Sequence, residues 1–241
     1  LYGVAVTGGN LGYGTVFTLK TNGTGFGTLR HFNGTTDGFF PRALILSGTN
    51  LFGTTSVTLF AMNTDGNGFT NLASFVAPGR GTPYGPIALS GDRIYGSTSD
   101  GGTGTRGTIY SVRTNGTGYV MLYQFPSTSG PSTTNSDGAI PRGVSVFGNA
   151  LYGTAEVGGN WGYGTVFKLS FPPPVLSIAR DGDNVLLKWP ASPGGFNLRT
   201  ATNLASPDWT TNSSVPVVVN GLNIVTNLNT GSQRYFRLQA D

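Results

Sequence analysis

The chain reads LYGTAEVGGNWGYGTVFKL over residues 151–169, and residues 1–19 carry nearly the same letters, LYGVAVTGGNLGYGTVFTL. Shorter copies lie in between, and they read LFG at 51–53, TLFAM at 58–62, IYG at 94–96 and GTIYSV at 107–112. The copies return at intervals of about 50 residues. Such self-similarity is the signature of a tandem-repeat protein.

The first three copies continue with the same three elements. A polar turn such as TNGTG at 21–25 holds the Asn-Gly or Asp-Gly pairs that tight hairpins favour. A run ending in an aromatic residue follows, and it reads LRHF at 29–32, LASF at 72–75 and LYQF at 122–125. A run opening with proline closes the unit, and it reads PRALILSG at 41–48, PIALSG at 86–91 and PRGVSVFG at 141–148.

Four short strands in about 50 residues is the period of a β-propeller blade. We therefore predict an all-β fold in which residues 1–171 form propeller-like tandem four-stranded blades, in about three and a half repeats. One blade cannot bury its own faces, so neighbouring blades must stack on one another.

The repeat count leaves the series of blades open at both ends. Counted from the proline strand, the chain starts on a second strand and stops after a third. Unpaired edges invite pairing with another chain. Either further blades lie upstream of Leu1, or two chains complete one ring, or the edges join subunits end to end. We favour the first arrangement and expect Leu1 to be a cut or a mature end.

The repeated elements resemble the GloVer tandem repeat. The resemblance rests on Leu-Tyr-Gly-Thr, Gly-Gly-Asn-x-Gly-Tyr-Gly-Thr-Val-Phe-Lys-Leu and Asn-Gly-Thr-Gly, and it covers about residues 1–171. It is weaker in the second unit, which lacks the Gly-Gly-Asn-x-Gly insertion. The resemblance implies a propeller-like fold in a secreted or surface-anchored bacterial protein. That family carries no catalytic signature, so no functional residue carries over.

A second domain follows a proline linker. The run FPPPV at 171–175 favours a stiff extended segment, and we place the linker at 172–175. Residues 176–241 contain six or seven strand-like runs, and alternation puts Val185, Leu187 and Trp189 on one face. We predict a small β-sandwich that resembles immunoglobulin-like or fibronectin-type-III-like modules, with Trp189 in its core.

Composition supports an all-β fold and limits the classes of partner and cofactor that we expect. Only 10% of residues are charged, 39 are glycine, and Glu156 is the only glutamate, although helix surfaces are built from Glu, Lys and Arg. The net charge of +4 is scattered, so we expect no nucleic-acid partner. The chain has no cysteine and one histidine, so we expect no metal or other cofactor. No apolar run reaches about 18 residues, so we expect no membrane span.

The acidic residues offer no evident catalytic pair. Glycoside hydrolysis needs two facing carboxylates, and the candidates are Asp37, Asp92, Asp100, Asp137 and Glu156. Asp37 and Asp137 recur because the repeat recurs, which favours a role in turns. His31 lies where other units carry Ser74 and Gln124, an ordinary strand position. We therefore predict that the protein is not an enzyme.

Aromatic residues in or beside the glycine loops are the candidate ligand-binding residues. Tyr13, Trp161 and Tyr163 can stack on sugar rings, with packing between blades as the alternative. Four asparagines open Asn-x-Ser/Thr triplets and are candidate glycosylation sites, namely Asn22, Asn33, Asn115 and Asn212. Asn22 and Asn115 occupy the same turn in two units, so turn formation explains them first.

Our first hypothesis is a non-catalytic structural or adhesive protein, extracellular or on the cell surface. It would serve as a subunit of a surface assembly or filament that self-associates through open strand edges. The alternative is a carbohydrate-binding module of a larger secreted protein, with glycans as partners. A third option, an accessory fragment of a polysaccharide-degrading enzyme, requires a catalytic domain upstream.

Overall fold

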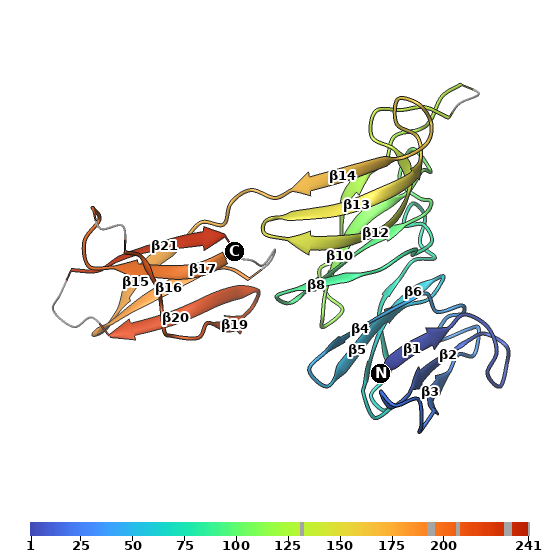
Figure 1. The fold of residues 1–241 in the computed structure, drawn as a ribbon, viewed down its shortest axis with the longest axis horizontal. Helices are drawn as coiled ribbons and strands as arrows, with labels where there is room; N and C mark the ends of the chain where they lie inside the picture. The colour runs from blue at the N-terminus through green and yellow to red at the C-terminus, as the bar shows by residue number, and fades with distance from the viewer. Residues whose placement is uncertain (131–132, 192–195, 206–207, 229–232, 241) are drawn as a thin grey trace. The chain divides into compact units, whose positions relative to one another are not determined.

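The computed structural model describes residues 1–130, 133–191, 196–205, 208–228 and 233–240. Within these ranges the chain forms β-strands and no helix, which confirms the prediction of an all-β fold (Figure 1). The described part of the chain therefore holds no helical segment with the length and hydropathy of a membrane span.

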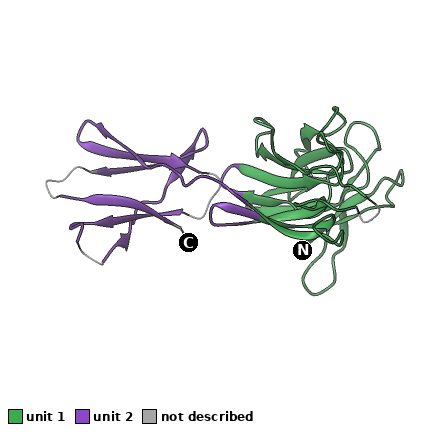
Figure 2. Ribbon diagram, turned by 90° about the horizontal axis from the view of Figure 1, so that it is seen from above, with its two compact units in different colours: residues 1–89, 93–145, 152–168 green, residues 90–92, 146–151, 169–241 purple. Residues whose placement is uncertain are grey.

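The chain folds into two compact units (Figure 2). The first comprises residues 1–89, 93–145 and 152–168, and the second comprises residues 90–92, 146–151 and 169–241. The second unit thus takes in two hairpin tips of the repeat region, which the boundaries drawn from the sequence assign to the repeat domain.

The repeat region forms four sheets, each built from strands that follow one another along the chain. The first sheet holds β1 (Tyr2–Ala5), β2 (Thr15–Thr18) and β3 (Gly27–His31). The second holds β4 (Ala43–Ser47), β5 (Asn50–Thr54), β6 (Thr58–Asn63) and β7 (Thr70–Ser74). The third holds β8 (Ala88–Ser90), β9 (Arg93–Thr98), β10 (Thr108–Arg113) and β11 (Val120–Gln124). The fourth holds β12 (Ala139–Phe147), β13 (Ala150–Val157) and β14 (Thr165–Ser170).

Each sheet is one blade, and its strands can be lettered by their place in the repeat. Strand a is the proline strand, b carries the Leu-Tyr-Gly letters, c carries Thr-Val-Phe, and d ends next to a phenylalanine. Within the described residues the first blade holds b, c and d, and the last holds a, b and c. The prediction of propeller-like blades in about three and a half repeats is confirmed.

The glycine of strand b makes room for the aromatic ring of strand c. Gly53 of β5 lies opposite Phe60 of β6, and a Cβ on Gly53 would come within 2.4 Å of the Phe60 ring. The corresponding distances at Gly3, Gly96 and Gly153 are 2.5, 2.4 and 2.4 Å, to Phe17, Tyr110 and Phe167. The motif therefore recurs because the ring of strand c covers the bare backbone of strand b.

Neighbouring blades are joined by contacts between aromatic rings. The phenylalanine that follows strand d packs on the strand c ring of the next blade, as Phe32 does on Phe60, with ring centroids 5.4 Å apart. The same contact joins Phe75 to Tyr110 at 4.8 Å and Phe125 to Phe167 at 5.3 Å. Centroid separations of about 4.5–7 Å are typical of favourable aromatic pairs. Stacked blades thus bury the faces that no single blade can cover.

The recurring prolines and the glycines of the loops also meet between blades. Gly14 has a φ of 100°, and a Cβ there would lie 2.4 Å from Cδ of Pro41 in the next blade. Gly107 has a φ of 104° and stands in the same relation to Pro141, also at 2.4 Å. Both the left-handed backbone and the close approach therefore require glycine.

The C-terminal module is a sandwich of two sheets. One sheet has the order β15 (Ser177–Asp181), β16 (Asn184–Pro190), β20 (Leu222–Leu228) and β19 (Val217–Val219). The other has the order β18 (Thr210–Thr211), β17 (Phe196–Ala201) and β21 (Tyr235–Ala240). Leu187, Trp189, Leu198 and Val225 form the core between them. The predicted small β-sandwich is confirmed, with Trp189 buried inside it.

Candidate functional site

The outer edge of the last blade is where the repeat departs from its own pattern. Val166 of β14 is 82% exposed, whereas Val16, at the same position of the first blade, is 0% exposed. Leu59 and Ile109, their counterparts in the second and third blades, are also fully buried. Because the letters around these residues are nearly identical, the difference comes from the neighbours of the strand. No described residue forms a strand d beside β14.

A hollow of about 380 Å³ lies beside this edge. Its lining includes Ser136, Gly159, Asn160, Trp161, Tyr163 and Thr165. Trp161 is 81% exposed and Tyr163 is 93% exposed. The hollow therefore combines two open aromatic rings with backbone and small polar groups.

The glycine loop that forms one wall of the hollow is internally ordered. The Gly164 N–H donates to the Gly158 carbonyl at 2.9 Å, as the Gly14 N–H does to the Gly8 carbonyl at 3.0 Å in the first blade. Asn135 adds a second support, since its Oδ1 accepts from the Gly159 N–H at 3.1 Å. The wall is therefore shaped before any partner binds.

In two other blades the same loop is also held by a side chain from strand d. The Asn10 N–H donates to Nδ1 of His31 at 3.3 Å, and the Thr103 N–H donates to Oε1 of Gln124 at 2.8 Å. His31 and Gln124 end their strands at the same repeat position. The only histidine of the chain is therefore an acceptor for a loop N–H.

The structure brings together two of the three predicted ligand-binding residues. Trp161 and Tyr163 both line the hollow. Tyr13 belongs to the glycine loop of the first blade, and its ring lies so close to Gly34 that a Cβ there would come within 2.5 Å. Tyr13 is not part of the lining of this hollow. Sugar binding by these residues stays a prediction.

The four candidate glycosylation residues share one local geometry. The Oδ1 of each accepts a hydrogen bond from the backbone N–H two residues on, over 3.1 Å at Asn22, 2.9 Å at Asn33, 3.0 Å at Asn115 and 2.9 Å at Asn212. These bonds are Asx turns, as the turn explanation predicts. Asn22 and Asn115 are exposed, whereas the Nδ2 of Asn33 also donates to Thr36 Oγ1 at 2.7 Å. Their glycosylation stays a prediction.

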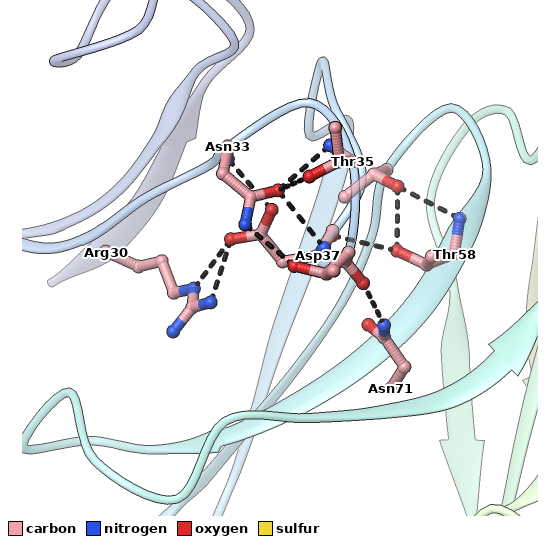
Figure 3. A network of polar contacts seen from close by, with 8 residues as sticks. Arg30, Asn33, Thr35, Asp37, Thr58 and Asn71 are labelled. Atoms are coloured by element: carbon pink, nitrogen blue, oxygen red, sulfur yellow. Dashed lines mark hydrogen bonds and ion pairs between the residues drawn. The ribbon is translucent and has the colours of Figure 1, made fainter.

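Asp37 is the centre of a polar network between the first two blades (Figure 3). It is only 2% exposed, and its carboxylate accepts from Nη2 and Nε of Arg30 at 2.8 and 3.2 Å and from the Asn33 N–H at 2.8 Å. Thr58 of the second blade donates to the Asp37 carbonyl at 3.3 Å. Asp37 thus joins strand d of one blade, through its carboxylate, to strand c of the next, through its backbone carbonyl.

Asp137 occupies the corresponding place before the fourth blade, with different partners. Hydroxyl donation from Ser136 and Tyr123 holds the pKa of the Asp137 carboxyl below its ordinary value. Burial and the bond to Asp137 raise the pKa of Tyr123 to about 12. Tyr123 thus takes the place that Arg30 has beside Asp37.

The remaining acids are also engaged locally. Glu156 forms an ion pair with Arg142, and Asp100 accepts from the Thr82 N–H at 2.7 Å. Across the described ranges, no three histidine or acidic side chains gather closely enough to hold a metal ion.

The adjacent apolar residues Val166 and Phe167 break strict alternation and so predict a strand covered on both faces, but the structure leaves Val166 82% exposed. The signal available was the strand count, which left the last unit without a fourth strand. The letters of the unit itself match those of the first blade, whose valine is buried, so local sequence cannot reveal the exposure.

Comparison with solved structures finds similar proteins of low sequence identity. The nidogen–laminin complex matches with a TM-score of 0.45 and 16% identity over 73% of this chain, which spans 64% of that chain. A TolB-type protein from Agrobacterium tumefaciens matches with a TM-score of 0.42 and 13% identity, covering 96% of this chain and 68% of that one. A gluconolactonase from Xanthomonas campestris matches with a TM-score of 0.40 and 15% identity, covering 72% and 61%. None of the curated proteins matches the sequence.

One of these similarities corrects the prediction that the protein is not an enzyme. The gluconolactonase is an enzyme, so the prediction is wrong. The lack of catalytic motifs in the sequence does not exclude enzymatic activity. At this identity and TM-score the likeness assigns no activity to the chain either.

Sequence comparison with family models is more specific. The model of the Gloeobacter/Verrucomicrobia repeat matches residues 1–167, which takes in all of the four blades except the end of β14. The Leu-Tyr-Gly and Tyr-Gly-Thr-Val-Phe letters within it are those whose packing builds each blade. The chain therefore belongs to the Gloeobacter/Verrucomicrobia repeat family.

Proposed function

We propose that this protein is a structural or adhesive component of the cell exterior and a subunit of a surface assembly. The observation that carries the proposal is the bare face of β14, where Val166 is exposed although its three counterparts are buried. Isolated apolar residues on a surface are normal, but a strand edge with an uncovered face is a template for association.

Mass photometry and electron microscopy over a range of concentrations test the assembly. We expect oligomers or filaments from the unmodified protein and monomers from the Val166→Asp variant, which places a charge on the bare face. Val217→Asp is the matched control, because Val217 is also exposed but lies in the C-terminal sandwich. Uniform monomers at all concentrations would contradict the assembly. Immunolabelling of intact cells tests the location, and a signal only after lysis would contradict it.

For the C-terminal module we propose an immunoglobulin-like or fibronectin-type-III-like fold. Support comes from its strand order, in which the first, second, sixth and fifth strands form one sheet. This corresponds to the A-B-E-D sheet of immunoglobulin constant-type domains, and Trp189 lies between the sheets. A crystal structure of the chain with another strand order would refute the assignment.

Carbohydrate binding is a second candidate function, favoured by the two open rings beside the hollow. Trp161 and Tyr163 expose their faces next to Asn160 and Ser136, and sugars are bound by such mixtures of ring and polar groups. A glycan array tests it with Trp161→Ala, and Phe147→Ala serves as the control because Phe147 is exposed elsewhere. Loss of glycan binding only in Trp161→Ala would support a role of this ring in sugar binding. Equal binding by the two variants would exclude Trp161 from the binding site.

A further inference from the structure

We propose that the outer edge of β14 and the adjoining hollow are an acceptor site for a fourth β-strand of this repeat's own type, donated by a second repeat-bearing chain. The inference deepens the proposed assembly, because it rests on the claim that the last blade is completed by another molecule. It does not depend on the location of the protein. Strand addition to an exposed sheet edge is an established mode of recognition.

The first argument is that strand d always meets strand c in one register. In the first three blades the opening threonine of strand c lies opposite the last residue of strand d, as Thr15 does opposite His31. Thr58 pairs with Ser74 and Thr108 with Gln124 in the same way. A bulge follows between the second and third residues of strand c in all three blades. Because Thr165 has this position in β14, the strand presents the same edge.

The second argument is that the hollow lies where the last residue of strand d is found in other blades. A Cβ on Gly9 would lie 2.9 Å from Nδ1 of His31, and one on Gly102 would lie 3.3 Å from Gln124. At Gly159 the nearest atoms belong to Gly164 and Thr165 instead. The backbone N–H of Asn160 corresponds to those of Asn10 and Thr103, which donate to His31 and Gln124. A histidine or glutamine from a donated strand therefore fits this place.

The third argument concerns the aromatic rings. In the second blade, Phe69 of the hairpin between strands c and d stacks on Phe60, with centroids 5.4 Å apart. Tyr119 stacks on Tyr110 in the third blade at 6.0 Å. Phe167 is the corresponding ring of the last blade, where no described residue supplies the hairpin, and it stays half-buried. A donated strand that begins with an aromatic residue would complete this stack.

The fourth argument is the cover of Val166. In the first blade Val16 packs in one core cluster with Phe32, the residue that follows strand d. A donated strand would place its own terminal phenylalanine over Val166. The expected ligand is therefore an extended segment with an aromatic residue at its start and Leu-x-His/Gln-Phe at its end, the pattern of residues 26–32 and 119–125.

The experiment adds a synthetic peptide, GFGTLRHFN, which copies residues 25–33, to the intact protein. Hydrogen exchange should slow within residues 158–168, with the peptide histidine opposite Thr165. A peptide with alanine in place of the second phenylalanine should bind about ten-fold or more weakly, because it cannot cover Val166. The Val166→Asp protein should bind the original peptide about ten-fold or more weakly, and Val217→Asp should bind it as the unmodified protein does.

Several outcomes would overturn the inference. One is unchanged hydrogen exchange in residues 158–168 at millimolar peptide. Another is protection from hydrogen exchange only outside these residues. A third is protection from hydrogen exchange that increases with protein concentration without peptide and that added peptide does not change. The edge would then be covered by a blade face of a second copy. Peptide binding by a protein that never assembles would refute the proposed function and leave strand acceptance standing. Assembly through a surface other than β14, with no peptide binding, would leave the proposed function standing and refute strand acceptance.

Discussion

Val16 and Val166 occupy the same position of the repeat, yet Val16 is fully buried and Val166 is almost fully exposed. Val16 packs with Phe32 of its own blade and Phe60 of the next. Val166 follows the same Tyr-Gly-Thr letters but has no described blade beyond it. Exposure in this protein therefore depends on the place of a blade in the series.

The two valines give a matched pair of substitutions. Val16→Ala should lower the free energy of unfolding by about 2 kcal/mol, because it leaves a cavity between two blades. In the unassembled protein, Val166→Ala should change it by less than about 0.5 kcal/mol, because the side chain is in solvent there. Urea unfolding followed by tryptophan and tyrosine fluorescence measures both. Equal losses would show that the last blade is covered in solution.

The glycine of strand b allows a second comparison. Gly53→Ala should destabilise the protein by about 2 kcal/mol, because the new Cβ would meet the Phe60 ring at 2.4 Å and the Ala43 carbonyl at 2.7 Å. Gly27→Ala is the control, since its Cβ would lie 3.5 Å from Thr18, an ordinary contact. Thermal unfolding of the two variants side by side checks the difference. A tolerated Gly53→Ala would contradict the packing of ring over glycine.

The buried carboxylate of Asp37 should matter more than an exposed one. Asp37→Asn removes the partner of Arg30 inside the joint between two blades, and we expect a loss of about 2 kcal/mol. Glu156→Gln breaks the ion pair with Arg142, whose side chains are 47% and 33% exposed, and should cost less than about 1 kcal/mol. Chemical denaturation at neutral pH ranks the two. A larger loss of stability for Glu156→Gln would contradict the prediction that the buried carboxylate contributes more than the exposed one.

The bond between Tyr123 and Asp137 predicts a dependence of stability on pH at both ends of the scale. Because the pKa of Tyr123 is raised to about 12, its contribution is present below the ordinary value of 10.0 and is lost as pH rises towards 12. The lowered pKa of Asp137 means that its contribution is present above its ordinary value of 3.8 and is lost as pH falls through the lowered one.

Tyrosinate absorbance and urea unfolding across the pH range check this prediction. Tyr123→Phe should flatten the alkaline loss of stability, and Asp137→Asn should shift one tyrosine titration to lower pH, because the hydrogen bond that favours the neutral phenol is weakened. An unchanged tyrosine titration in Asp137→Asn would show that burial alone raises the pKa of Tyr123.

Much of the fold could be predicted from the sequence alone, because the repeated residues contact each other within short segments of the chain. Glycine in strand b and an aromatic residue in strand c are close along the chain and face each other across one hairpin, so their recurrence reports the blade directly. The alternation of Val185, Leu187 and Trp189 likewise predicted one buried face of the sandwich. Patterns of this kind depend on strand geometry, which a short segment determines by itself.

The sequence by itself therefore determined the strands, their order within each blade and the number of units. Only the tertiary structure decided which of two identical positions is covered, that His31 and Gln124 both hold a loop, and that Arg30 and Tyr123 both pair with the aspartate before the next blade. The reason is that these hydrogen bonds join strand d to loops elsewhere in the fold, and that burial also depends on residues of the neighbouring blade. Those neighbours are set by stacking between units, which no single repeat encodes.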